Sequence, residues 1–107
     1  MENNMAITGK ERAELRAEAH HLDPLVHVGA QGVTPTLVSA LDDALRTREL
    51  VKVQLGRPTD ERPRVIAERL AQETGAIVVQ VIGRTATLYR ENPELERKHG
   101  EPPPWRR

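Results

Sequence analysis

The chain has 107 residues, enough for one domain with a single modest hydrophobic core and too few for two domains. Its 16 basic and 16 acidic residues balance to a net charge of zero, which excludes a polycation, so nucleic-acid binding would require local segregation of charge. The sequence contains no cysteine, no signal-peptide pattern and no apolar run near the ~20 residues of a membrane helix. We therefore expect a cytoplasmic protein without disulfides.

The first predicted element is a helix over residues 9–20. Thr8 and Glu11 fit a capping box, in which two side chains satisfy free amides at the helix start. Apolar residues then recur at helical spacing. The next segment, residues 25–28, is short, β-prone and bounded by proline and glycine, so it predicts a strand.

A second helix and a second strand follow. Thr34 has the character of an N-cap, and Pro35 suits the first helical position, where its missing N–H costs nothing. Residues 50–55 (LVKVQL) alternate apolar and polar side chains. This alternation predicts a strand with Lys52 and Gln54 on one face and apolar residues on the other.

The last three elements are a helix, a strand and a hairpin partner. The third helix is predicted to end at Gly75, a suitable C-cap. Residues 76–82 (AIVVQVI) are nearly all apolar, which predicts a central strand covered on much of both faces. Gly83-Arg84 is a two-residue link that favours a type II′ hairpin to a strand over residues 85–90.

The order α-β-α-β-α-β-β predicts an α/β fold. Right-handed crossovers would place both crossover helices on one side of the sheet, giving a compact two-layer domain with three helices and a four-stranded mixed sheet. We expect an N-terminal tail over residues 1–7, the domain over residues 8–90 and a charged, proline-rich tail over residues 91–107. That tail has no apolar period and is expected to be mobile, or a frayed helix leading into a polyproline segment.

Catalytic motifs are missing from the sequence. There is no nucleophile elbow, P-loop or dinucleotide fingerprint. His20 and His21 are neighbours, which diverge by ~100° on a helix and cannot form a zinc-binding pair. No enzyme, cofactor or metal is predicted.

The stretch HVGAQGVTPT, residues 27–36, has two possible interpretations. Without Cβ atoms at Gly29 and Gly32, the main chain can approach a phosphate or sugar closely. The helix after Thr34 begins with free N–H groups and a positive dipole end, which favour an anion. Alternatively, the two glycines only turn the chain from strand to helix.

Basic side chains elsewhere could assist this loop in binding a phosphate backbone. The candidates are Lys10, Arg16 and His20 on the first helix, Lys52 on the second strand and Arg84 at the hairpin tip, although each also fits a solvated surface charge. With one Tyr, one Trp and no Phe, a sheet that stacks bases on aromatic rings is not expected. Binding through backbone contacts and cations would depend strongly on salt.

A family resemblance covers almost the whole domain, from residue 7 to residue 90. The segments LRAEAHHLDPLVHVGAQGVTPTLVSALDDAL, ELVKVQL and ETGAIVVQVIGRTATLYR resemble the CRM domain (chloroplast RNA splicing and ribosome maturation) in its stand-alone bacterial YhbY-like form. The resemblance implies an RNA-binding domain without catalysis, with a KH-like GxxG loop and a fold similar to the C-terminal domain of translation initiation factor three. Bacterial members are associated with precursors of the large ribosomal subunit. Arg84 stands where lysine is common, and the loop residues Ala30 and Gln31 are uncharged, so the loop would contribute main-chain contacts.

The resulting hypothesis is a monomeric RNA-binding protein that acts on ribosomal RNA during maturation of the large subunit. The alternative is an adaptor that docks a protein partner through its surface or its PPPW tail. The RNA-binding residues expected from the sequence are Gly29, Ala30, Gln31, Gly32, Thr34, Lys52, Arg84, His20, Arg16 and Lys10.

Overall fold

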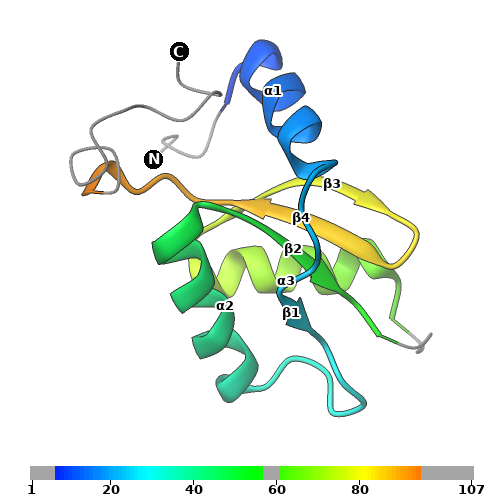
Figure 1. Cartoon of the computed structure of the whole chain (residues 1–107). Coiled ribbons are helices and arrows are strands. Elements are labelled where there is room, and N and C mark those ends of the chain that lie inside the picture. The colour runs from blue at the N-terminus through cyan, green and yellow to red at the C-terminus, as the bar shows by residue number, and fades with distance from the viewer. Residues whose placement is uncertain (1–6, 57–60, 95–107) are drawn as a thin grey trace.

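The computed structural model describes residues 7–56 and 61–94. Its elements are α1 (Gly9–Ala19), β1 (Val26–His27), α2 (Pro35–Arg48), β2 (Leu50–Gln54), α3 (Pro63–Thr74), β3 (Ile77–Ile82) and β4 (Thr85–Tyr89), in the predicted order (Figure 1). Most of the predicted C-terminal tail, including its PPPW segment, lies outside the described residues.

The helix ends follow the local signals in the sequence. The Thr8 hydroxyl accepts a hydrogen bond from the Glu11 amide, and the Glu11 carboxylate accepts one from the Thr8 amide, so the capping box is confirmed. The Thr34 hydroxyl accepts from the Leu37 amide at the start of α2. Gly75 ends α3 in the left-handed region, with a φ of 77°.

The sheet has the strand order β1-β2-β4-β3. β1 runs parallel to β2, whereas β4 is antiparallel to both of its neighbours. The predicted central position of residues 76–82 is therefore wrong: β3 is an edge strand, because the hairpin folds back and inserts β4 between β2 and β3. Gly83 has a φ of 58° and Arg84 has no positive φ, as a type II′ turn requires.

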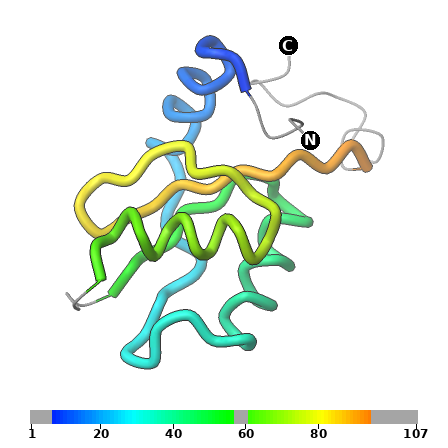
Figure 2. The backbone as a smooth tube through the Cα atoms, turned by 180° about the vertical axis from the view of Figure 1, so that it is seen from behind, coloured from blue at the N-terminus to red at the C-terminus, as the bar shows by residue number. Residues whose placement is uncertain are grey.

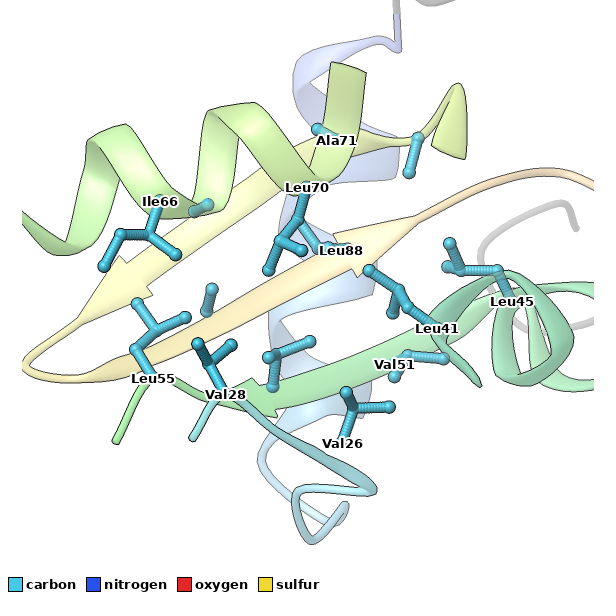
Figure 3. Close-up of a cluster of buried hydrophobic side chains, with 14 residues drawn as sticks. Val26, Val28, Leu41, Leu45, Val51, Leu55, Ile66, Leu70, Ala71 and Leu88 are labelled. Atoms are coloured by element: carbon cyan, nitrogen blue, oxygen red, sulfur yellow. The ribbon is translucent and has the colours of Figure 1, made fainter. Parts of the chain in front are cut away.

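Both crossover helices pack on the same face of the sheet, as predicted. Figure 3 shows Leu41 and Leu45 of α2 and Leu70 of α3 meeting apolar side chains of the strands. Val51 and Leu88, from the two inner strands, complete the centre of this cluster and are fully buried. The view from behind in Figure 2 shows α2 and α3 on the same side of the strands.

α1 lies on the opposite face and covers only one end of it. Its buried residues Leu15 and Ala19 contact a second apolar cluster that includes Leu50 and Tyr89, which are partners across β2 and β4. The chain after α1 then crosses the sheet to reach β1 (Figure 1). The two predicted layers are thus accompanied by a partial third one. Within residues 7–56 and 61–94, no helix covers the end of this face near the β3–β4 turn.

A β-bulge in β3 decides which side chains reach this open end. The register with β4 shifts between Val78 and Gln80, so Val79 is the extra residue. Because side chains alternate along a strand, one extra residue reverses the faces of all residues beyond it. Val81 consequently packs against the main core, and Gln80 and Ile82 fall on the face that carries α1.

Candidate nucleic-acid interface

The GxxG loop, Gly29–Gly32, is an exposed connection between β1 and α2. The Gly32 amide donates to the Gly29 carbonyl oxygen at 3.0 Å, which closes a tight turn. Gly32 has a φ of 74°, a conformation that favours glycine. Gly29 has no positive φ, and a Cβ atom built on it would meet nothing within 4 Å. Turn geometry therefore explains the second glycine and leaves the first unexplained.

A shallow groove of about 460 Å³ lies beside this loop. Its walls include Gly29 and Gly32, the N-cap Thr34 and His27 at the end of β1. The first turn of α2 contains no acidic residue, and none of the groove residues is acidic. Main-chain amides and the positive end of the α2 dipole thus border a space without anionic side chains, which suits a phosphate group.

Charge is segregated along the chain despite its neutral total. Residues 24–41, 50–59 and 75–90, which include all four strands and the GxxG loop, contain no aspartate or glutamate. The acidic residues of the described elements lie on the helices and at their ends. Although the net charge is neutral, the sheet and the loop are therefore free of anionic side chains, as nucleic-acid binding would require.

Two of the predicted cations meet on the open end of the sheet. The Lys52 ammonium donates to the Ala19 carbonyl oxygen at the end of α1, at 3.1 Å. Lys52 and His20 line the same small hollow, of about 190 Å³. Arg16 is exposed and lies one helical turn before His20 on the same side of α1.

The other two predicted cations are placed differently. The Arg84 guanidinium donates from Nε to the Gly56 carbonyl oxygen at 2.6 Å, so it braces the chain that follows β2. Lys10 is exposed and nine positions from the buried Ala19, which places the two on opposite sides of α1. The structure thus brings Lys52 and His20 together, places Arg16 one helical turn from His20 and leaves Lys10 apart from them.

Comparison with known proteins agrees with this geometry. The CRS1/YhbY (CRM) domain model matches residues 7–90. The chain belongs to this family. "Probable RNA-binding protein YqeI" of Bacillus subtilis (strain 168) is 39% identical over 88 residues, which are 82% of this chain and 92% of the relative.

A further relative and a solved structure are similar to this CRM domain. A Haemophilus influenzae protein named "RNA-binding protein" is 34% identical over 90 residues, covering 84% of this chain and 91% of the relative. The solution structure of the hypothetical protein SAV1595 from Staphylococcus aureus superimposes with a TM-score of 0.69 at 36% identity, over 81% of this chain and 91% of that one. The predicted α/β fold, with three helices and a four-stranded mixed sheet, is confirmed. The CRM family and these names point to no enzymatic reaction, as the sequence predicts.

Several residues of this CRM domain beside the hollow were not predicted from the sequence. They are Gln80, Ile82, Thr85 and Thr87, which line it together with Lys52 and His20. Gln80 is the lone polar residue in AIVVQVI, and this polarity is the signal in the sequence that could have indicated it. The pairing of Thr87 with Lys52 on one side and Gln80 on the other is set by strand register, which no local pattern in the sequence reveals.

The described residues of this CRM domain contain neither a candidate metal cluster nor a candidate membrane helix. Within residues 7–56 and 61–94, no three His, Asp or Glu side chains are grouped to hold a metal ion. Within the same ranges, no helix has the length and apolar character needed to cross a membrane.

Proposed function

We propose that the chain is a non-catalytic RNA-binding protein that associates with ribosomal RNA in precursors of the large ribosomal subunit and assists their maturation. Three observations support RNA as the ligand: the relatives named for RNA binding, the acid-free stretches around the strands and the groove beside the GxxG loop. The ribosomal role follows from the family resemblance, and the expected cytoplasmic location and monomeric state accompany it as predictions.

Gly29 is the observation that carries the proposal. Its conformation does not require glycine, and its missing side chain leaves the backbone open toward solvent. An ordinary side chain would fit the folded protein at this position and would obstruct only a ligand that comes close to the main chain. The GxxG loop would therefore hold the RNA backbone with its amides, while the charge comes from Lys52 and Arg16.

A charge reversal in the loop tests this proposal. The double variant Ala30→Asp, Gln31→Asp places two carboxylates where a phosphate would bind. Because like charges repel, we expect RNA affinity to fall by tenfold or more, a loss of at least about 1.4 kcal/mol in binding free energy. The matched control is Ala13→Asp, Gln72→Asp, which changes the same residue types at exposed positions on α1 and α3. Its affinity should stay close to that of the unchanged protein.

Fluorescence anisotropy with a labelled fragment of large-subunit ribosomal RNA measures these affinities, and circular dichroism confirms that both variants fold. Equal affinity of the loop variant and its control would refute the proposed loop contact. Because both variants change net charge by the same amount, a general electrostatic effect would lower both affinities together.

Crosslinking in cells, followed by sequencing of the attached RNA, tests the ribosomal part of the proposal. We expect enrichment of precursor large-subunit RNA, and loss of that enrichment in the loop variant. Co-sedimentation with subunit precursors that persists after RNase treatment would instead favour the adaptor interpretation.

A further inference from the structure

The open end of the sheet carries seven side chains in two rows. The first row is His27, Gln54, Thr85 and Ile82, and the second is Lys52, Thr87 and Gln80, as the strand register shows. We call these residues the open rows. Five of the seven side chains end in amides, hydroxyls or an ammonium group, one is histidine and none is acidic.

The hollow in these rows contains polar groups without hydrogen-bond partners among the described residues. Thr87 is only 1% exposed and lines the hollow, yet its hydroxyl makes no hydrogen bond to any described residue. The Gln80 amide is half-buried and likewise makes no side-chain hydrogen bond within the described ranges. Because an ammonium has three donors, Lys52 keeps donors beyond the one that Ala19 accepts. Polar groups in this condition favour a ligand that can hydrogen-bond to them.

The size and walls of the hollow limit what it can hold. Its volume of about 190 Å³ is below the ~300–1,000 Å³ of sites for whole drug-sized ligands. Ile82, which is 62% exposed, and the His20 ring offer apolar and planar surfaces on its rim. A single flat ring with polar edges matches these dimensions and this chemistry.

We propose that this hollow binds one unpaired nucleobase of the RNA, with Gln80, Thr87 and Lys52 reading its edge and Ile82 and His20 contacting its face. The inference rests on the proposed function, because it needs the RNA backbone to be held at the GxxG loop. It adds that the protein prefers single-stranded RNA and selects among bases.

The open rows connect the hollow to the loop. His27 lines the groove beside the GxxG loop and also begins the first row. From His27 on β1 to Ile82 on β3 there are three inter-strand spacings, or about 14 Å. A short stretch of extended RNA can span this distance. A duplex cannot use the hollow, because its bases are stacked and paired inside the helix and cannot enter the hollow singly.

The donors predict which bases are preferred. The Lys52 ammonium and the Gln80 amide nitrogen both donate, so they favour a base with carbonyl oxygens at its edge. Uracil, guanine and cytosine have such oxygens and adenine has none. We therefore expect uridine-rich strands to bind more tightly than adenosine-rich ones.

Competition binding with the full chain tests this inference. The probes are octamers of uridine, octamers of adenosine and a duplex of mixed sequence. We expect the uridine strand to bind about tenfold more tightly than either of the others, the scale of a good side-chain contact to a base edge. Gln80→Leu and Thr87→Val should each reduce this preference severalfold, whereas Thr87→Ser, which keeps the hydroxyl, should preserve it. Gln72→Leu on the exposed side of α3 is the matched control.

The outcomes separate this inference from the proposed function. Equal affinity for the two strands and the duplex would overturn the base site, as would a preference that survives both Gln80→Leu and Thr87→Val. In either case the proposed function stands if Ala30→Asp, Gln31→Asp still weakens binding of all probes. The proposed function itself fails if that loop variant has no effect.

Discussion

The Arg12 guanidinium of α1 donates a hydrogen bond to the carbonyl oxygen of Val79, the extra residue of the β3 bulge, at 2.8 Å. The same nitrogen donates to the Val78 carbonyl oxygen at 3.1 Å. A bulge locally disrupts the regular ladder, and Arg12 donates to two carbonyl oxygens at this point of β3. Since the bulge turns Gln80 and Ile82 toward the open rows, α1 both covers one end of the sheet and fixes the residues at the other.

Replacing Arg12 should therefore destabilise the domain and alter the hollow. Arg12→Ala removes two hydrogen bonds from a charged donor to partly buried carbonyls, and we expect the free energy of unfolding to fall by about 1–3 kcal/mol. Arg16→Ala, on the exposed side of the same helix, should change it by less than about 0.5 kcal/mol. Urea denaturation measures both. Equal stability of the two variants would contradict the role of Arg12 at the bulge.

Alanine should lower the free energy of unfolding at Gly56 and leave it unchanged at Gly29. A Cβ atom on Gly56 would lie 2.3 Å from the Val28 carbonyl oxygen, and its φ of 75° adds about 1–2 kcal/mol for an alanine. We expect Gly56→Ala to lower the free energy of unfolding by at least about 2 kcal/mol. Gly29→Ala should leave it unchanged and weaken RNA binding, because only a ligand approaches that backbone. Urea denaturation and RNA anisotropy, run on both variants, check this pair, and a strongly destabilised Gly29→Ala would count against it.

Element order and helix ends were predictable because their causes are local. The capping box at Thr8, Pro35 after its N-cap, Gly75 and the turn at Gly83 each act over a few residues. The edge position of β3 was not predictable, since an apolar run fits a central strand equally well. The bulge was also hidden, because it is fixed by Arg12, 67 positions away from Val79.

The candidate site likewise has a part that the sequence predicts and a part that it does not. Gly29–Gly32 and Thr34 form a local pattern that is visible in the sequence, and the first three residues of this loop are exposed. Lys52 and His20 share a hollow only because α1 ends above β2, and Thr87 reaches it only through cross-strand pairing. Side chains that meet through tertiary structure leave no spacing signal in a single sequence.

Arg90 should be the main polar link between the sheet and the two crossover helices. Its NH1 donates to the Asp42 carboxylate at 2.6 Å and to the Thr74 carbonyl oxygen at 2.7 Å, and its NH2 donates to the Asp42 carbonyl oxygen at 3.1 Å. Arg90→Met should lower the free energy of unfolding by about 2–3 kcal/mol, because it leaves these acceptors unpaired. Asp42→Asn keeps an oxygen acceptor and should cost about 1 kcal/mol or less. Thermal denaturation separates the two, and a loss for Asp42→Asn as large as that for Arg90→Met would show that the ion pair outweighs the backbone contacts.

Lys52 should contribute to both stability and salt-dependent RNA binding, and two substitutions separate these effects. Lys52→Met removes the cation and its hydrogen bond to Ala19, so we expect a loss of about 1 kcal/mol in stability. Because the Lys52 charge also adds to the positive potential that the RNA backbone meets, the slope of log affinity against log salt should become shallower, by at most about 0.7, the value for one full phosphate contact on a single strand. Lys52→Arg keeps the charge and should keep the slope. Titrations across a range of KCl concentrations measure it. A reduced stability with an unchanged slope would assign Lys52 to the α1 contact alone, and the cation for the RNA would then have to come from Arg16.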